Sequence, residues 1–253
     1  MVSVPGHWPY PLWIAHRGAG KLAPENTLAA FRLGAAHGYR AFECDVKLSA
    51  DGVPFLLHDS TLDRTTSGQG QAGSKGWADL SRLDAGGWHS RAFRGEPLPT
   101  LEAVSRFCIG NGYALDLEIK PSPGREAETG RAVAQAAAHL WNESAMPPLL
   151  TSFKPDSLEA ALETAPHLPR GLLLDSLDAD WLNRATALRC AAVVTSYSLM
   201  DTGVIEALRN AGMRAMAYTV NDPAEVARLC SMGIDGIVTD AIDRFSPALH
   251  ALA

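Results

Sequence analysis

The residues of this chain that are best suited to chemistry gather at the ends of short apolar stretches that resemble β-strands. They comprise a histidine, an arginine, a lysine and three carboxylates: His16, Arg17, Glu43, Asp45, Glu118 and Lys120. Side chains alternate between the two faces of a strand, so Glu43 and Asp45 share a face. Glu118 and Lys120 do the same in the other strand. Such carboxylates suit Mg²⁺ or Ca²⁺ rather than zinc, and the set suggests a divalent metal with an anionic substrate.

Two histidines, His16 and His58, differ from the others because each directly follows a predicted strand. The near-neutral pKa of imidazole lets one histidine take a proton from an attacking oxygen while the other returns a proton to the leaving oxygen. The sequence leaves open which histidine is the acid and which is the base. We expect Arg17 and Lys120 to hold phosphoryl oxygens, with the metal neutralising the charge that develops on them.

Further side chains lie at or just past the ends of predicted strands, where a barrel places its active site. Phe153 and Tyr218 are aromatic members of this set, and we expect both to contact the substrate. Asn221 and Asp240 lie at strand ends as well, without an assigned role. Asn26 has two interpretations: it either caps the helix that follows or contacts the substrate beside the end of the first strand.

The elements that position these residues alternate along the chain between short apolar runs and amphipathic helical stretches. This alternation predicts a parallel sheet with helices outside it. The predicted strands are Leu12–Ala15, Ala41–Val46, Pro54–Leu57, Ala114–Ile119, Leu149–Ser152, Gly171–Leu174, Ala192–Ser196, Arg214–Thr219 and Gly236–Val238. The predicted helices are Thr27–His37, Glu126–Trp141, Pro155–Thr164, Ala179–Thr186, Thr202–Ala211 and Pro223–Met232. Asn26, Asp201 and Asp222 are candidate N-caps.

The nine predicted strands are one more than a closed eight-stranded barrel needs. A turn signal in the sequence explains the extra strand. The Asp51-Gly52 pair is a hairpin signal and leaves no room for a helix before residue 54. The run 54–57 should therefore return antiparallel and bring His58 beside the first two carboxylates. We predict the α/β class: a TIM-type (β/α)8 barrel with a β-hairpin and a small insertion subdomain after the second barrel strand.

The segment 60–100 differs from the rest of the chain because it is rich in Gly, Ser, Thr and Arg and has only short helical patterns. One interpretation is a surface loop without a function of its own. Loops of this length are more often lids or small subdomains, so we expect an insertion over the barrel mouth. We therefore expect one barrel domain, 1–253, with 60–100 inserted within it.

The composition limits the classes of partner. A formal net charge of −6, without basic runs, argues against a nucleic acid or an anionic membrane. Residues 1–7 lack the features of a secretory signal, and no apolar run approaches the roughly 18 residues of a membrane span. Cys44, Cys108, Cys190 and Cys230 lack metal-ligand spacing, so we expect buried, reduced thiols and a cytoplasmic location.

Taken together, the motifs resemble those of glycerophosphodiester phosphodiesterases, and most closely those of the cytoplasmic bacterial enzyme. The likeness runs from Ile14 to about Ile242. The segments that carry it are His16-Arg17-Gly18, Pro24-Glu25-Asn26-Thr27, Glu43-Cys44-Asp45-Val46, Asp51-Gly52, His58-Asp59, Thr61-Leu62-Asp63-Arg64-Thr65-Thr66, Leu83-Asp84-Ala85-Gly86, Glu118-Ile119-Lys120-Pro121, Tyr218-Thr219-Val220-Asn221 and Gly236-Ile237-Val238-Thr239-Asp240. One such motif is weak evidence, but this many in order make a specific signal.

The resemblance implies a metal-dependent barrel hydrolase that cuts glycerophosphodiesters to sn-glycerol 3-phosphate and an alcohol. By position it assigns the metal ligands to Glu43, Asp45 and Glu118. It assigns acid–base catalysis to His16 and His58. It assigns phosphate contacts to Arg17 and Lys120. Two routes stay open: water attacks phosphorus directly, or the glycerol 2-hydroxyl attacks first and gives a cyclic phosphate. The resemblance and the proximity of that hydroxyl favour the second route.

Three competing functions have less support. A phospholipase should bring an exposed apolar loop or a secretion signal, and neither is visible in the sequence. A barrel that only binds ligands should have lost a histidine or a metal ligand, yet each is present. A metal-assisted lyase or aldolase leaves His58 and the insertion unexplained. The expected partner is a small-molecule glycerophosphodiester, whose head group is not predicted because Ser60 and Tyr218 depart from the common family residues.

Overall fold

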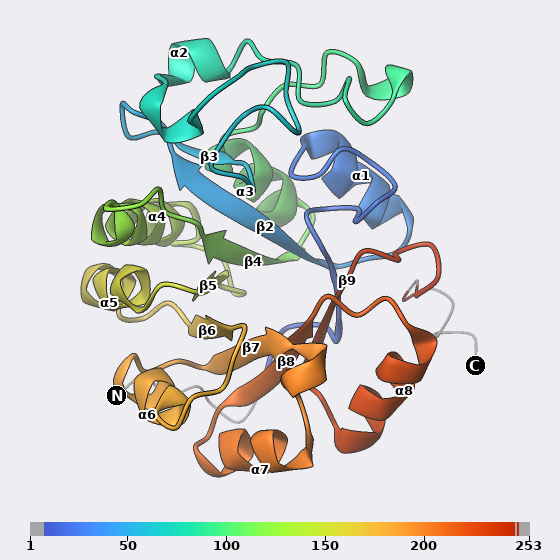
Figure 1. Ribbon diagram of the computed structural model, residues 1–253, viewed down its shortest axis with the longest axis vertical. Coiled ribbons are helices and arrows are strands. Elements are labelled where there is room, and N and C mark those ends of the chain that lie inside the picture. The colour runs from blue at the N-terminus through green and yellow to red at the C-terminus, as the bar shows by residue number, and fades with distance from the viewer. Residues whose placement is uncertain (1–7, 246, 248–253) are drawn as a thin grey trace.

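Eight parallel strands close into a barrel at the centre of the molecule (Figure 1). The computed structural model describes residues 8–245 and 247. Hydrogen-bonded neighbours follow the order β1-β9-β8-β7-β6-β5-β4-β2, and a β1–β2 pairing closes the ring. The barrel strands are β1 (Trp13–Ala15), β2 (Ala41–Leu48), β4 (Ala114–Ile119), β5 (Leu149–Ser152), β6 (Arg170–Leu174), β7 (Ala192–Ser196), β8 (Arg214–Tyr218) and β9 (Gly236–Thr239). The predicted TIM-type barrel is confirmed.

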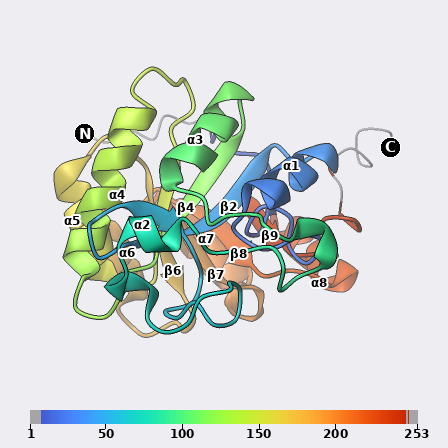
Figure 2. The same cartoon turned by 90° about the horizontal axis from the view of Figure 1, so that it is seen from above.

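Helices cover the outside of the barrel (Figures 1 and 2). They are α1 (Leu28–Ala36), α3 (Leu101–Gly110), α4 (Glu126–Leu140), α5 (Pro155–Thr164), α6 (Trp181–Ala187), α7 (Thr202–Asn210) and α8 (Pro223–Met232). All the helices expected from the sequence are present. Helix α3 was not predicted, because it begins directly after the Gly-rich and Ser-rich segment. Its start is nevertheless well defined, since the Thr100 side chain accepts a hydrogen bond from the Ala103 N–H.

The expected hairpin is present as well. Strand β3 (Pro54–Leu56) runs antiparallel to β2, and Val46 pairs with Leu56. Gly52 in the connecting turn has φ +82°, in the left-handed region that glycine adopts without a steric cost. The hairpin returns the chain toward the carboxyl ends of the barrel strands, so His58 follows β3 at the barrel mouth.

Residues 57–100 continue from the hairpin as an excursion at the top of Figure 1. They contain helix α2 (Trp77–Leu80) and the 3₁₀ turns η1 (Ala72–Ser74) and η2 (Arg91–Phe93). With Phe55 of β3, the excursion buries an apolar cluster of its own: Phe55, Leu57, Leu62, Ala72, Leu80, Ala85 and Leu98. This cluster holds the excursion against the hairpin.

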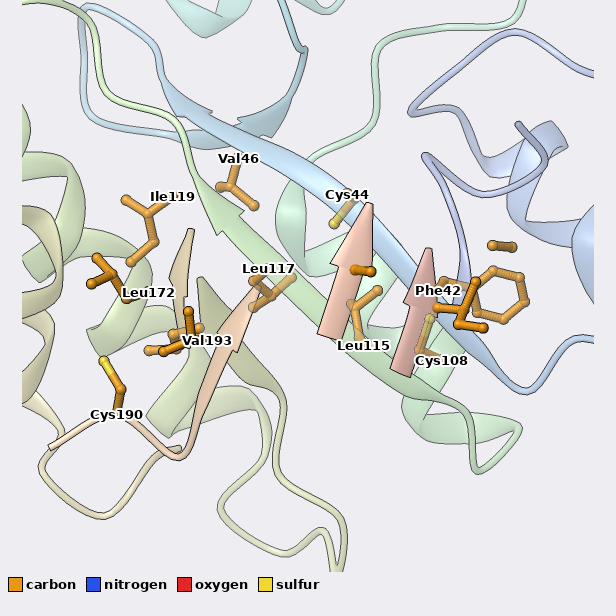
Figure 3. Close-up of a cluster of buried hydrophobic side chains, with 14 of the residues drawn as sticks. Phe42, Cys44, Val46, Cys108, Leu115, Leu117, Ile119, Leu172, Cys190 and Val193 are labelled. Carbon is orange, nitrogen blue, oxygen red and sulfur yellow. The ribbon is translucent and has the colours of Figure 1, made fainter. Parts of the chain in front are cut away.

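Strands β2 and β4 are buried on both faces, and each face has a different chemistry. Alternate residues point outward into the apolar layer beneath the helices (Figure 3): Phe42, Cys44, Val46, Leu115, Leu117 and Ile119. The intervening residues therefore point into the barrel. These are Glu43 and Asp45 on β2, and Asp116 and Glu118 on β4. Burying one face of each strand thus aims the carboxylates of the other face at the barrel interior.

Some expectations need correction. Asn26 does not cap α1, because the hydroxyl of Thr27 accepts the hydrogen bond from the helix. Asp201 and Asp222 do cap α7 and α8. Three of the cysteines are buried as expected, but Cys230 is exposed.

The expected absence of a signal sequence concerns residues 1–7, which lie outside the described residues. Among the helices of the described residues, none combines the length and the apolar character needed to cross a bilayer.

Candidate active site

A cavity of about 230 Å³ opens at the carboxyl ends of the barrel strands, the end at which such barrels bind ligands. Its lining is formed by His16, Arg17, Glu43, His58, Asp116, Glu118, Lys120, Thr151, Phe153, Leu173, Val194, Tyr218, Thr219 and Val238. Most of the predicted site residues are in this lining. Asp45 and Asn26 are buried and lie outside it.

The pairing of β2 with β4 brings the carboxylates together. Asp45 lies opposite Glu118, and Glu43 lies opposite Asp116. One oxygen atom from each of Glu43, Asp45 and Glu118 lies within 4.8 Å of the others, and all three residues are buried. Oxygen atoms at this separation can contact a single divalent cation.

The electrostatics of this cluster fit a cation. Burial, together with the charges of Asp45 and Glu118, raises the pKa of Glu43 well above its usual range. Burial and Asp45 likewise raise the pKa of Glu118 to about 7. Glu43 Oε1 is buried and has no hydrogen-bond partner among the described residues. A divalent cation would supply both the missing contact and the missing positive charge, so the donor set fits Mg²⁺ or Ca²⁺.

Two cationic side chains, Arg17 and Lys120, pair with the cluster and line the cavity beside it. Arg17 Nη1 is 2.9 Å from Glu25 Oε1, and its Nε is 3.3 Å from Asp45 Oδ2. Lys120 Nζ is 2.8 Å from Glu118 Oε1 and 3.2 Å from Asp45 Oδ1. Burial alone would raise the pKa of Asp45, but these two cations outweigh it and hold that pKa below the usual range. Both cations also line the cavity, where they can contact an anion.

His16 is held by the carboxylate of Asp240, a residue that the sequence locates at a strand end without indicating its role. Its Nδ1 is 2.6 Å from Asp240 Oδ1, while its Nε2 is 3.7 Å from Glu43 Oε2. Asn221 holds Asp240 in turn. The Asn221 amide donates to Asp240 Oδ2 at 3.3 Å, and its Oδ1 accepts from the Asp240 backbone N–H at 2.9 Å and from the Thr239 hydroxyl at 3.1 Å. Asp240 thus orients the imidazole.

His58 has the same arrangement with a different partner. Its Nδ1 is 2.7 Å from Asp59 Oδ1. Arg64 bonds Asp59 Oδ2 at 2.6 Å and also donates to Glu25, which joins the 57–100 excursion to the loop after β1. Burial, reinforced by the nearby Arg17, lowers the pKa of His58. The adjacent His58-Asp59 pair was visible in the sequence, whereas no local pattern indicated the contact with Arg64.

The predicted aromatic residues lie at one side of the cavity. The rings of Phe153 and Tyr218 meet edge to face with centroids 5.8 Å apart. Lys120 Nζ lies 5.9 Å from the centroid of Phe153. The hydroxyl of Tyr218 donates to the Leu174 carbonyl, so this ring is held in place in the lining of the cavity.

Asn26 neither caps α1 nor lines the cavity. Its Nδ2 donates to Asp45 Oδ2 at 2.7 Å, and its Oδ1 accepts from the Asp45 backbone N–H at 3.1 Å. Its backbone has φ +60°, in the left-handed region that asparagine tolerates better than most residues. Asn26 therefore clamps one carboxylate of the cluster from behind.

Comparison with known proteins identifies relatives over nearly the whole chain. Residues 16–244 match the model of the Glycerophosphoryl diester phosphodiesterase family. The Bacillus subtilis protein YhdW is 35% identical over 91% of this chain and 94% of its own length. A protein named glycerophosphodiester phosphodiesterase from Caldanaerobacter subterraneus subsp. tengcongensis is 31% identical over 90% of this chain and 93% of its own.

A solved structure agrees with these matches. It is a phosphodiesterase from Oleispira antarctica in complex with the product sn-glycerol-3-phosphate. It is 33% identical and superposes with a TM-score of 0.88 over 95% of this chain and 97% of the other. Sequence and fold thus agree along almost the full length, and the chain belongs to the glycerophosphoryl diester phosphodiesterase family.

Proposed function

We propose that this enzyme hydrolyses glycerophosphodiesters to sn-glycerol 3-phosphate and an alcohol in a reaction that needs a divalent metal. The observation that carries the proposal is the meeting, around one cavity, of a carboxylate cluster, two cations and two carboxylate-bound histidines. The product bound to the Oleispira antarctica phosphodiesterase supports this class of substrate. The expected single catalytic domain, the insertion 60–100 and the cytoplasmic location belong to the same proposal.

Glu43, Asp45 and Glu118 are the residues that would hold Mg²⁺ or Ca²⁺. When bound, such an ion neutralises charge that develops on the phosphoryl oxygens. Arg17 and Lys120 bind the phosphoryl oxygens from the cavity wall. Their ion pairs with the cluster hold both side chains in place before the substrate arrives.

His16 and His58 act as the acid–base pair. Each imidazole has its Nδ1 bound to a carboxylate, which favours the tautomer with the proton on Nδ1. In each ring, Nε2 is then the nitrogen that exchanges a proton with the substrate. Phe153 and Tyr218 contact the substrate at the side of the cavity, and Asn26 contributes by holding a carboxylate of the cluster.

The glycerol 2-hydroxyl is the first nucleophile in this proposal. One histidine takes the hydroxyl proton as the oxygen attacks phosphorus, and the other gives a proton to the departing alcohol. A cyclic phosphate results. In the second half the roles reverse, because one histidine now takes a proton from water and the other protonates the 2-oxygen. An intramolecular nucleophile gains a large proximity advantage over water.

The test is release of sn-glycerol 3-phosphate from glycerophosphocholine with Mg²⁺ or Ca²⁺, with EDTA, and with the His16→Ala protein. We expect release that depends on the metal and disappears in the variant. A substrate without the 2-hydroxyl separates the routes, since normal turnover of the 2-deoxy analogue would rule out the cyclic phosphate. No release from any glycerophosphodiester by folded, metal-loaded protein would overturn the proposed function.

A further inference from the structure

Asp116 is the third carboxylate in the lining of the cavity, beside Glu43 and Glu118, and the proposed chemistry does not use it. It lies opposite Glu43 and two residues before Glu118 on β4, so it faces the barrel interior below the metal cluster. Asp116 is 6% exposed, and its Oδ1 accepts a 2.6 Å hydrogen bond from the Thr151 hydroxyl. Among residues 8–245 and 247, the other oxygen, Oδ2, has no hydrogen-bond partner. Because Asp116 lines the cavity, Oδ2 is available to a ligand.

Below the metal cluster, the rest of the cavity wall is largely apolar. Leu173, Val194 and Val238 line the same cavity and belong to the apolar cluster inside the barrel. Asp116 and Thr151 therefore place polar atoms in the inner part of the cavity. A ligand group that reaches this depth meets an apolar wall with one carboxylate–hydroxyl pair, which is the arrangement that selects a hydroxyl group.

The chemistry of the substrate decides which hydroxyl this is. Every glycerophosphodiester carries the same glycerol moiety, whereas the alcohol on the other side of phosphorus varies. The variable alcohol needs the open mouth, and the constant glycerol moiety can occupy the enclosed end. The 2-hydroxyl must stay beside phosphorus to react, so the terminal hydroxyl is the one that reaches deepest. A buried hydroxyl needs a hydrogen-bond partner to offset its desolvation.

We propose that Asp116 and Thr151 form a subsite that binds the terminal hydroxyl of the substrate's glycerol moiety. Asp116 Oδ2 accepts the hydrogen bond of that hydroxyl, and the Thr151 hydroxyl keeps the carboxylate oriented from Oδ1. This inference rests on the proposed function, because a glycerophosphodiester brings that hydroxyl into the site.

Two chromogenic esters test the subsite. Glyceryl p-nitrophenyl phosphate and 2-hydroxypropyl p-nitrophenyl phosphate share the leaving group and the 2-hydroxyl, and they differ in the terminal hydroxyl alone. With metal present, we expect wild-type kcat/KM to favour the glyceryl ester by about 10- to 100-fold. Asp116→Leu and Thr151→Val should lower that ratio through loss of glyceryl ester turnover. Thr129→Val removes a buried hydroxyl on α4 that bonds the Arg125 carbonyl, and this control should keep the wild-type ratio.

The outcomes separate the subsite from the function. If wild-type protein cleaves both esters with equal kcat/KM, or if Asp116→Leu and Thr151→Val fold and keep the wild-type ratio, the subsite is wrong and the function stands. If folded, metal-loaded wild-type protein cleaves neither ester and releases no sn-glycerol 3-phosphate from any glycerophosphodiester, both proposals are overturned. The wild-type comparison needs no substitution, so it remains decisive even where a variant fails to fold.

Discussion

Replacing Asp240 by asparagine should remove the control over which nitrogen of His16 carries the proton. The two carboxylate oxygens of Asp240 have different partners: Oδ1 faces His16 Nδ1, and Oδ2 accepts from the Asn221 amide. Asn221 cannot turn over to accommodate a change, because its Oδ1 already accepts from the Asp240 backbone and from Thr239. The Asn221 NH₂ group therefore always points toward residue 240 as a donor.

This arrangement determines how the introduced amide of Asp240→Asn will lie. If its oxygen faced His16, its NH₂ would face the NH₂ of Asn221, and two donors would meet. The favoured orientation places the NH₂ against His16 Nδ1. His16 Nδ1 must then accept, so the proton moves to Nε2, the nitrogen that should exchange a proton with the substrate.

The magnitude follows from the contact that is lost. The 2.6 Å bond joins an imidazole and a carboxylate whose side chains are 17% and 21% exposed. A hydrogen bond to a charged group contributes about 1.5–3 kcal/mol, which is about 10- to 150-fold in rate if the bond is fully formed in the transition state. The wrong tautomer adds to this loss. We expect kcat to fall by about 100-fold or more, with KM changed by less than about threefold.

A second variant separates the tautomer from the charge. In Asp240→Asn/Asn221→Asp, the new carboxylate at position 221 accepts from the amide at position 240, so the amide oxygen can face His16 again. We expect kcat to recover by about tenfold over the single variant, without reaching wild type, because the charge beside His16 is not restored. Asp235→Asn is the matched control, since Asp235 precedes β9 at the other end of the barrel and bonds Arg214.

The assay is release of sn-glycerol 3-phosphate under saturating metal, with circular dichroism and thermal unfolding to verify the fold of each variant. The reasoning would be refuted by an Asp240→Asn protein that keeps kcat within about threefold of wild type, a change of less than about 1 kcal/mol. It would also be refuted if the double variant were no faster than the single variant, because the tautomer would then not be the cause.

Three further predictions concern the metal, the core and the close approach of α1 to the loop after β1. Metal binding at pH 6 should release protons, and metal affinity should rise with pH, because burial and a neighbouring carboxylate raise the pKa of Glu118 to about 7. Calorimetry in two buffers measures the protons released. Arg170→Met should lower the free energy of unfolding in urea by about 3 kcal/mol, since the buried guanidinium donates to three backbone carbonyls. Gly34→Ala should cost about 1–3 kcal/mol, because the added carbon would lie 2.1 Å from the Gly18 carbonyl oxygen. The matched control is Gly110→Ala, in which the added carbon has no neighbour within 4 Å. This variant should raise the free energy of unfolding by up to about 1 kcal/mol.

Each of these has a result that would contradict it. Metal uptake at pH 6 without proton release would show that Glu118 is already ionised in the metal-free protein. An Arg170→Met protein as stable as wild type would mean that the freed carbonyls find other partners. Equal unfolding free energies for the two glycine variants would show that α1 can move away from the loop after β1 at no cost.

Much of the site was predictable from local patterns. Side chains of an extended chain alternate between its two faces whatever the partner strand is. The sequence of β2 alone therefore indicates that Glu43 and Asp45 share a face. The hairpin followed from Asp51-Gly52, because the turn conformation itself requires such residues. Helix α3 was missed although Thr100 is a good cap, because the irregular segment before it hid its start.

By itself, the sequence determined which groups are available for chemistry and that they lie at strand ends, because spacing along one strand or turn depends on covalent geometry alone. The tertiary structure decided what each group touches. Asp240 lies 224 positions from His16 along the chain, and their contact exists because β9 pairs with β1 when the barrel closes. Arg64, which holds Asp59, also bonds Glu25, 39 positions away, because the excursion packs against the loop after β1. Asn26 clamps Asp45 rather than capping α1 because the loop after β1 packs against β2. These contacts depend on long-range packing, which no local spacing in the sequence encodes.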